Sequence, residues 1–449
     1  MSYNNTASCF NGKKGQIKNG PGEQPSSNIL ADTGPQLEAL MTVIPADEFP
    51  DGGLEAWSVV LGAWCSNFVS FGWVACMGVF QAYYQTHKLH HRSPSSIAWI
   101  LSTESFALFA CAPVFGHIFD NYGARALLVG GAAFHVFGLM MVSLSKEYYQ
   151  ILLAQGVCSA VGASAVYWAC SNAVGTGWLR RRGLAMGIAS SGSSVGGIVG
   201  TAAIPALFDK IGFAWTMRAA AFVYLFLLSI SITTVKSRLA HKSVKFQALD
   251  LVRPLKEKPV LLVAVGCFFF FLGVLLPDNF IPIEAMDAGM SSSRANSLLV
   301  IFCAATTIGR IVPGWAGDRF GIFNVTIAFT YLSTLLVFVL WIPAKSDPSR
   351  MAFAGLYGFS SALVSAIPTL AAQVCSNIDK LGAYMGAIYI VLSPAILMGQ
   401  PIVGALLGAS GSGNYLYLKI FAGLMMFIGG GVFIFARFAF DGGEKGIWI

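Results

Sequence analysis

Charged residues are scarce in this chain, and the shortage limits the kinds of protein it can be. Asp, Glu, Lys and Arg together make up 11% of its 449 residues, whereas hydrophobic residues make up 55%. Soluble domains carry roughly 25% charged residues, so this chain lacks the polar surface that would cover it in water. Long apolar runs account for the shortage, because about 20 apolar residues span a bilayer as a helix. The composition therefore predicts an all-α integral membrane protein that crosses the bilayer many times.

The chain also lacks the motifs of common catalytic and cofactor sites. Its nine cysteines form no CxxC pair and no Cys/His cluster at metal-ligand spacing. Most of them lie inside apolar runs, where a thiol behaves as a small hydrophobe. There is no phosphate-binding Walker loop and no plausible Ser/His/Asp arrangement. We therefore expect no enzymatic activity, no metal, no cofactor and no nucleic-acid partner.

Hydropathy divides the chain into twelve candidate spans. They lie near residues 57–83, 97–116, 126–145, 150–173, 183–207, 215–235, 259–281, 295–316, 325–343, 351–374, 383–407 and 415–438. The longest break, 236–258, follows the sixth span and is rich in Lys and Arg. It separates two six-helix halves, 51–235 and 259–438, and short tails remain at 1–50 and 439–449. We expect the first tail to be disordered, because it is polar and rich in Asn, Gly, Ser and Pro.

The basic residues indicate how the spans are oriented, since cytoplasmic loops carry an excess of Lys and Arg. Arg180, Arg181, Arg182, the 236–258 loop and three lysines of the first tail lie on one side of the predicted membrane. The opposite loops carry only scattered single basic residues. We therefore expect both termini and the basic loop in the cytoplasm. The expected location is the plasma membrane, with the vacuolar membrane as the alternative.

A charged, glycine-marked turn occurs twice. In "GHIFDNYGAR" (116–125) and "GWAGDRFG" (314–321), the pattern Gly116, Asp120, Gly123 recurs 198 residues later as Gly314, Asp318, Gly321. A second pair, "GLAMG" (183–187) and "GAYMG" (382–386), recurs after 199 residues. Two matches at nearly the same offset, in equivalent positions of the two halves, indicate a duplicated six-helix unit. Transport sites form between the halves of such duplicated proteins.

Physical chemistry suggests what the turn does. Gly116 allows two helices to approach closely, and Gly123 permits a tight turn with a positive φ. Asp120 precedes a helix, where the helix dipole favours an anion. We expect this turn and its copy, with Arg125 and Arg319, to hold the halves together at the cytoplasmic face in one state and to release them in another. The alternative is a plain topological turn with a basic anchor.

The turn resembles the signature loop of the major facilitator superfamily. "DGGLEAW" (51–57) and "WLRRRGLAMGIASSGSSVGG" (178–197) further resemble two motifs of its monocarboxylate porter family, and "AWILSTESFALFACAPVFGHIFDNYGAR" (98–125) resembles fungal members in particular. The residues that match these motifs are Asp51, Gly52, Gly53, Trp57, Arg181, Arg182, Gly187 and Gly192. The resemblance covers residues 51–440. It implies a carrier in which two halves rock about a central site, often with a proton coupled to a small carboxylate.

The chain departs from this family where carboxylates are bound. Carboxylate carriers of the family use a lysine in span one and an Asp/Arg pair in span eight. By alignment the lysine position falls on Ala75, the arginine on Arg310 and its acidic partner on Thr306. Replacement of two of these three residues argues against lactate-like transport.

A few residues inside the spans are candidates for substrate or proton contact. Glu104 lies near the middle of span two, where a carboxylate is costly unless it faces a cavity, pairs or binds a proton. A protonated carboxyl bonded between helices is the structural alternative. Arg310 either faces the cavity, with the substrate or Glu104 as its partner, or extends to the interface.

The resemblance adds cavity candidates, because spans one, four, seven and ten surround the path in this fold. These are Asn67, Tyr167, Trp168, Asn279 and Tyr357. Asp278 and Glu284 are expected at the outer rim of span seven.

Three hypotheses for the function remain. The first is a secondary-active carrier, working by alternating access, that exports a fungal small organic molecule or secondary metabolite. The second is a proton-coupled importer of a monocarboxylate or related nutrient. The third is a receptor that senses a nutrient without transporting it, which the short 236–258 loop and 439–449 tail do not favour. The expected partners are a small-molecule substrate, protons as the candidate coupling ion and the lipid bilayer, with a monomer as the transport unit.

Overall fold

The structure is a computed structural model that describes residues 51–237, 252–410 and 415–440. These residues belong to one compact unit, Phe49–Ile449. The predicted tail 1–50, most of the basic loop 236–258 and nearly all of the tail 439–449 lie outside the described residues. The disorder predicted for the first tail and the cytoplasmic location predicted for all three segments therefore stay predictions. Every regular element in the described ranges is helical, which confirms the predicted all-α class.

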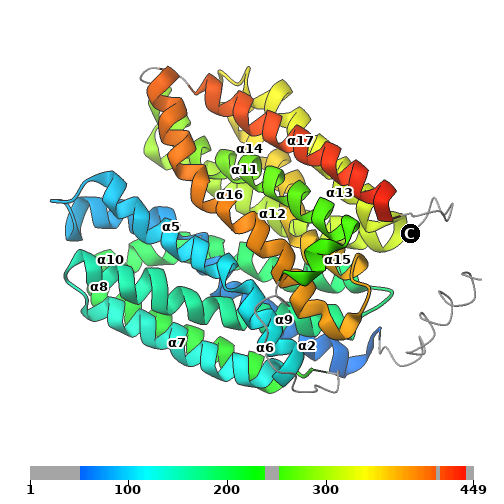
Figure 1. Cartoon of the computed structure of the whole chain (residues 1–449). Coiled ribbons are helices and arrows are strands. Elements are labelled where there is room, and N and C mark those ends of the chain that lie inside the picture. The colour runs from blue at the N-terminus through cyan, green and yellow to red at the C-terminus, as the bar shows by residue number, and fades with distance from the viewer. Residues whose placement is uncertain (1–50, 238–251, 411–414, 441–449) are drawn as a thin grey trace, which may run out of the picture. The chain divides into compact units, whose positions relative to one another are not determined.

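The N-terminal half contains the elements drawn from blue to green in Figure 1. Its helices are α2 (Gly53–Val69), α3 (Phe71–Val74), α4 (Met77–Tyr83), η2 (Tyr84–Lys88), α5 (Pro94–Ala110), α6 (Ala112–Tyr122), α7 (Ala124–Leu144), α8 (Tyr148–Ile151), η3 (Leu152–Ser159), α9 (Ala160–Gly177) and α10 (Arg182–Thr234). Consecutive short elements combine into single passes, as when α5 and α6 continue one another across Cys111.

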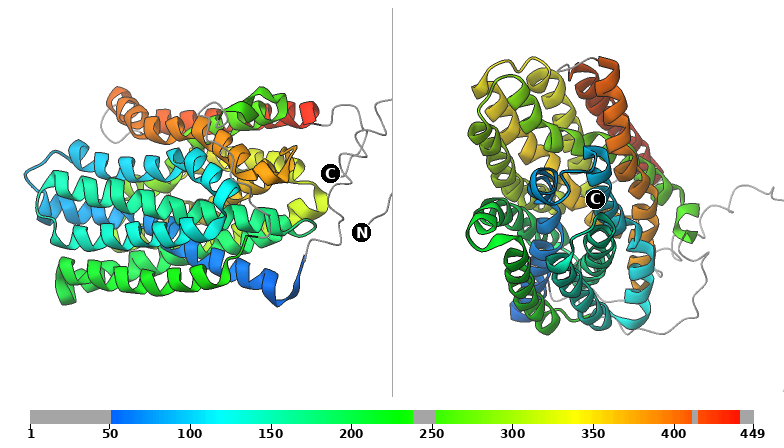
Figure 2. Two further views of the ribbon diagram at one scale, coloured as in Figure 1. Left: turned by 60° about the horizontal axis from the view of Figure 1, so that its bottom comes forward. Right: turned by 90° about the vertical axis from the view of Figure 1, so that its left-hand side faces the viewer.

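The C-terminal half contains the elements drawn from green to red. They are η5 (Arg253–Lys256), α11 (Lys258–Asp287), α12 (Ser292–Phe320), α13 (Ile322–Leu336), η6 (Val337–Trp341), α14 (Asp347–Ser361), η7 (Ala362–Ala366), α15 (Ile367–Gln373), η8 (Ile378–Lys380), α16 (Leu381–Ser410) and α17 (Leu416–Phe440). The long helices of both halves run in roughly the same direction in Figure 2.

The number of passes depends on α10, which has 53 residues. At about 1.5 Å per residue it is about 80 Å long, more than twice the hydrocarbon thickness of roughly 30 Å. Gly212 interrupts it with non-helical dihedrals, φ 76° and ψ 164°. Among the described residues, eleven helices are long and apolar enough to cross a membrane. Since α10 supplies two passes, the twelve predicted spans are accommodated.

Local sequence explains where several helices begin. The Ser93 hydroxyl accepts the Ser96 backbone N–H at 3.2 Å, and Pro94 occupies the first turn of α5. Ser346 forms a capping box with Ser349 at the start of α14. Serine caps satisfy N–H groups that have no partner inside a helix, and proline has no N–H to satisfy there.

Small residues let the first and fifth spans pack backbone to backbone. Gly192 and Gly196 of α10 lie against the carbonyl oxygens of Trp64 and Phe68 in α2. A Cβ atom at Gly192 would overlap the Trp64 oxygen, and backbone cannot move aside as a flexible side chain can. This contact is the small-residue packing that replaces the hydrophobic effect as the driving force between helices in lipid.

We predict that Gly192→Val lowers the stability of the folded protein by about 1–3 kcal/mol, the usual cost of overpacking. Gly130→Val in α7 is the matched control, because a Cβ at Gly130 has nothing within 4 Å. Thermal unfolding of both purified variants measures the difference. An equal melting temperature for the two variants would contradict the predicted α2–α10 contact.

Candidate functional site

Asp120 connects the two halves. Its carboxylate lies in the last turn of α6 and accepts the backbone N–H groups of Gly382 and Ala383, each at 2.9 Å. Those two residues begin α16 in the other half. The first N–H groups of a helix have no intrahelical partner and lie at the positive end of its dipole, so a carboxylate is well placed there.

Asp318 makes the same contact in the opposite sense. Its carboxylate, near the end of α12, accepts the N–H groups of Gly183 and Leu184 at 2.7 and 2.8 Å. These residues begin α10 of the N-terminal half. The two contacts, called the lock contacts below, hold together the same end of both halves. The duplicated turn therefore binds the partner half, rather than the helix that follows it in sequence as the dipole argument had predicted.

Glycines make the lock contacts possible. A Cβ atom on Gly116 would overlap the Gly382 carbonyl oxygen, and one on Gly314 would overlap that of Gly183. These positions confirm the close approach predicted for Gly116. Gly123 directly follows α6 with a φ of 78°, and Gly321 directly follows α12 with a φ of 83°. The predicted positive φ is therefore also confirmed. Such backbone angles are readily available only to glycine.

The arginines of the turn take no part in the lock contacts. The Arg319 guanidinium lies over the Trp315 ring, 5.4 Å from its centroid. Arg125 is exposed. A gating role for these two residues stays a prediction.

The two sequence motifs at 51–57 and 178–182 contact each other. The Asp51 carboxylate accepts the N–H groups of Leu179 and Arg180 at 2.9 and 3.0 Å. The rings of Trp57 and Trp178 meet edge to face, 5.0 Å between centroids. Both motifs thus fix the segment that leads into α10, which carries one lock contact.

The remaining motif residues lie around the same segment. Arg182 is buried and donates through Nε to the Trp178 carbonyl at 2.8 Å, whereas Arg181 is exposed. Gly53 begins α2 with φ 86°, directly after Gly52. Gly187 lies against the backbone of Arg310, so this motif glycine supports the second site described next.

Arg310 lies in α12 where that helix packs against α10 of the other half. Its guanidinium donates to the Ser190 carbonyl in α10 at 3.1 Å. The Nε atom is buried and has no hydrogen-bond partner among the described residues, although the side chain as a whole keeps some accessible surface. Asp278 and Tyr167 lie within electrostatic reach. Arg310 therefore has donors to spare at the boundary between the halves.

Thr306 stands where carboxylate carriers of the resembling family have the acidic partner of the arginine, and here it makes a neutral contact. The Thr306 hydroxyl bonds to that of Ser194 in α10 at 2.9 Å. This further link between α10 and α12 is neutral, so it cannot balance the charge of Arg310. Asp278 in α11, expected only at the rim, is an acid that interacts electrostatically with Arg310.

Aromatic side chains gather next to Arg310. Phe109 lies 5.8 Å from both Phe271 and Tyr389 of the other half, and Trp168 lies 4.4 Å from Tyr389, measured between ring centroids. This aromatic cluster comprises Phe71, Phe109, Tyr167, Trp168, Phe271 and Tyr389. Tyr167 connects it to Arg310, because it interacts with both Tyr389 and the arginine. A planar apolar molecule with one acidic group would match these neighbours.

Glu104 lies in a separate network inside the N-terminal half. Its two carboxylate oxygens accept Trp73 Nε1–H at 2.7 Å and Gln155 Nε2–H at 3.0 Å. The Tyr84 hydroxyl in turn donates to Gln155 Oε1 at 2.6 Å. Glu104 is only 1% exposed. It does not pair with Arg310 in this structure, so that suggested partnership is wrong.

The other cavity candidates differ in position. Asn67 is buried and donates to the Ala63 carbonyl of its own helix at 2.9 Å. Tyr357 is fully buried and donates to the Val274 carbonyl at 2.9 Å. Asn279 is exposed, whereas its neighbour Asp278 lies near Arg310. The structure thus brings only Tyr167 and Trp168 of this set to the Arg310 site.

Sequence reasoning missed a buried ion pair in the C-terminal half. Glu284 lies in the last turn of α11, at the end of span seven as expected, but it is 8% exposed and binds Lys419 at 2.6 Å instead of facing solvent. A lysine inside the first turn of an otherwise apolar span was the available signal, because charges within spans are rarely unpaired.

The sequence of the chain is similar to those of known membrane transporters. A family model described as the Major Facilitator Superfamily matches residues 62–400. The chain is 43% identical over 390 residues to "MFS transporter asaE" of Aspergillus flavus, with 86% of this chain and 88% of that protein covered. It is 41% identical over 390 residues to the "Fujikurins efflux protein" of Gibberella fujikuroi, with coverage of 86% and 83%.

Among solved structures, the crystal structure of the transporter FucP in its outward conformation is similar. The TM-score is 0.67 at 15% identity, and the match covers 85% of this chain and 98% of that one. At this identity the likeness concerns the fold alone.

We predict that Asp120→Asn and Asp318→Asn each slow transport severalfold without lowering the amount of protein in the membrane. An asparagine loses the charge and can accept only through one oxygen, which removes roughly 1–2 kcal/mol from one conformational state. Asp209→Asn, at an exposed acid of α10, is the matched control.

Cys375 reports the opening of this end. Burial raises the pKa of its thiol to about 12, and Asp120 and Arg182 lie within electrostatic reach. In a variant that keeps Cys375 as its only cysteine, both lock substitutions should speed maleimide labelling severalfold. Unchanged labelling with unchanged transport would contradict a gating role for the lock contacts.

Proposed function

The chain belongs to the major facilitator superfamily, and from this premise we propose that it is a secondary-active carrier that exports a small organic acid with an aromatic or otherwise apolar body. It binds a small-molecule substrate within the membrane, as transporters of this superfamily do. We place it in the monocarboxylate porter branch on its motifs at 51–57 and 178–197. An enzymatic activity forms no part of the proposal.

The observation that carries the substrate class is the environment of Arg310. A guanidinium offers five N–H donors and cannot lose its charge in a protein. Arg310 uses one of them on Ser190, and its Nε has no partner among the residues that the structure describes. The adjoining aromatic cluster has members from both halves. All of them except Phe71 are at most 8% exposed here, so they become an apolar surface for a ligand when the halves move apart. A carboxylate at Arg310 with its ring system against the aromatic cluster would satisfy both features at once.

The names of two relatives support export as the direction of transport. The Fujikurins efflux protein and the "Aspyridones efflux protein apdF" of Emericella nidulans take their names from exported compounds. Import of a short monocarboxylate has less support, because Ala75 and Thr306 replace two carboxylate-handling residues. A non-transporting receptor has no feature in its favour among the described residues.

The lock contacts support an alternating-access cycle. Each acidic side chain binds a helix terminus of the opposite half, so both contacts must break before this end can open. We place this end, both termini and the basic loop in the cytoplasm. The protein acts as a monomer in the plasma membrane, with the vacuolar membrane as the alternative location.

We predict that deletion of the gene causes an acidic, aromatic metabolite to accumulate in cells and to fall in the medium. The parent gene should reverse this, and Arg310→Gln should not. The loss of a charge-assisted contact weakens binding by about tenfold or more. Metabolite profiling of cells and medium by mass spectrometry measures the effect.

Arg218→Gln is the control for this test. Arg218 is also a partly buried arginine, with the Ser143 hydroxyl and the Trp215 ring as partners, but it lies away from Arg310. Full complementation by Arg310→Gln, or identical metabolites in deletion and parent strains, would contradict the proposal.

We assign proton coupling to Glu104, whose carboxylate accepts hydrogen bonds from the neutral side chains of Trp73 and Gln155. Glu104→Gln should abolish transport driven by a pH gradient and preserve exchange of substrate across the membrane, because exchange needs only the loaded carrier to reorient. Reconstituted vesicles with an imposed pH gradient separate the two modes. Trp73→Phe, which removes one donor and keeps the carboxylate, should retain gradient-driven transport. Gradient-driven transport by Glu104→Gln would remove this residue from the mechanism.

A further inference from the structure

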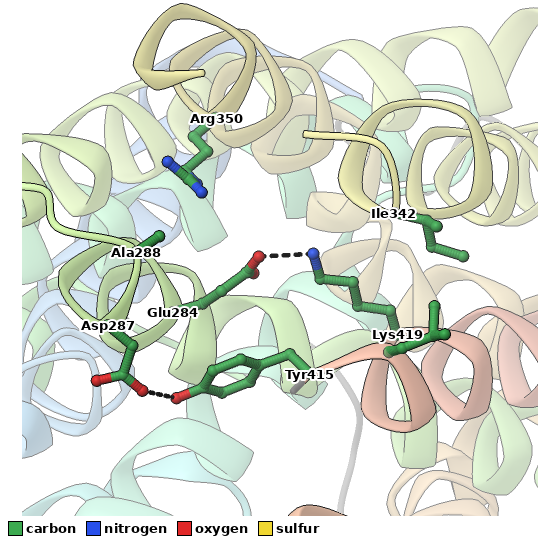
Figure 3. Close-up of a pocket in the computed structure, with 8 residues that line it drawn as sticks. Glu284, Asp287, Ala288, Ile342, Arg350, Tyr415 and Lys419 are labelled. Atoms are coloured by element: carbon green, nitrogen blue, oxygen red, sulfur yellow. Dashed lines mark hydrogen bonds and ion pairs between the residues drawn. The ribbon is translucent and has the colours of Figure 1, made fainter. Parts of the chain in front are cut away.

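The C-terminal half contains a polar cavity of about 280 Å³ far from the lock contacts. Glu257, at the start of α11, binds the Tyr384 hydroxyl close to Gly382. The cavity lies at the other end of α11, beside Glu284 and Asp287. Thirty residues of helix separate these two ends by about 45 Å. Residues of α11, α14 and α17 line the cavity (Figure 3).

Most charges around this cavity already have partners. Glu284 binds Lys419 at 2.6 Å and accepts Trp341 Nε1–H at 2.6 Å. Lys419 also donates to the Trp341 carbonyl at 2.9 Å. Asp287 accepts a hydrogen bond from the Tyr415 hydroxyl. Figure 3 shows these two pairs side by side on one wall. The acidic groups are thus occupied, which leaves little for a cation to bind.

Arg350 is the exception. Its side chain lines the cavity and is 8% exposed, and its Nε is buried without a hydrogen-bond partner among the described residues. The nearest acid, Asp347, is 3.7 Å away, beyond hydrogen-bond length, and also faces Arg294 at 3.3 Å. A buried guanidinium with unused donors is costly, since each lost water contact has no replacement. The free group in this cavity is therefore a donor with a positive charge.

We propose that this cavity binds a small organic carboxylate, whose two oxygens accept hydrogen bonds from Arg350. The planar fork of a guanidinium matches a carboxylate in a bidentate pair. A water molecule takes up about 30 Å³ in the liquid, so the cavity has room for a small molecule. The ligand would bridge α11, α14 and α17, with Lys419 beside its charge. This site is separate from Arg310 and does not depend on the proposed export function.

The experiment measures binding of radiolabelled benzoate to the full-length protein in lipid nanodiscs. All variants carry Arg310→Gln, so that Arg310 cannot contribute. Saturable binding to one site is expected in this background. It should weaken about tenfold or more when Arg350→Gln is added, as the loss of a charged hydrogen-bond donor predicts.

Arg294→Gln is the matched control, because it removes the other arginine that faces Asp347 without touching the cavity. It should leave the benzoate affinity unchanged. Ala288→Leu covers the case in which Arg350→Gln does not fold. Ala288 lines the cavity, so leucine fills the space, keeps every charge and should weaken binding by a similar factor.

Three results would overturn the proposal. One is absence of saturable benzoate binding when Arg310→Gln is the only change. Another is equal affinity with and without Ala288→Leu or Arg350→Gln. The third is displacement of benzoate by inorganic phosphate at lower concentration than by acetate, which would assign the cavity to a different anion. Because Arg310 is absent throughout, none of these results bears on the exported substrate.

Discussion

The first N–H groups of a helix cannot bond within that helix, and in a membrane protein they have little water to bond instead. Asp120 and Asp318 satisfy four such groups, two at the start of α16 and two at the start of α10. The requirement explains why the acids, the glycines and the helix starts occur together in sequence. The acid supplies the acceptor, and the glycine allows the backbones to come close enough. The order of the passes then brings each acid to the terminus in the opposite half.

Charges elsewhere in the helices follow two patterns. Glu104 is bonded to two neutral donors, and Glu284 to a lysine and an indole. Both oxygens of each carboxylate therefore have a partner, which lowers the cost of holding an acid inside a membrane protein. Arg310 and Arg350 instead keep a buried Nε that has no partner within the described part of the chain. Unused donors on a permanent cation are costly in a static scaffold and useful where an anion binds, which is the physical basis of the two sites proposed at these arginines.

Sequence was sufficient for the architecture because the membrane imposes strong rules. Span length and the repeated turn predicted the helices and the major facilitator superfamily, whereas the porter family indicated by the motifs near residues 51 and 178 stays a prediction. The positive φ of Gly123 followed from its residue type. Sequence could not identify the partner of Asp120. The helix that starts next in the chain was the expected partner, whereas the actual one is a helix start 262 residues away. Sequence also could not show which of the adjacent residues Asp278 and Asn279 lies near Arg310, because that depends on the side of α11 that each occupies. Lys419 carried a readable signal, but its partner Glu284 depends on the packing of α11 against α17.

The reciprocity of the lock contacts has a consequence for how such a protein can arise. Each half supplies one acid and one helix start that donates its backbone N–H groups, and the two contacts are equivalent under exchange of the halves. An interface of this kind is isologous, as in a twofold symmetric dimer. Two identical six-helix chains would therefore already make both contacts, with the same surface on each. Fusion of a duplicated gene adds only a connecting segment, after which the copies are free to diverge, one acquiring Arg310 and the other Glu104.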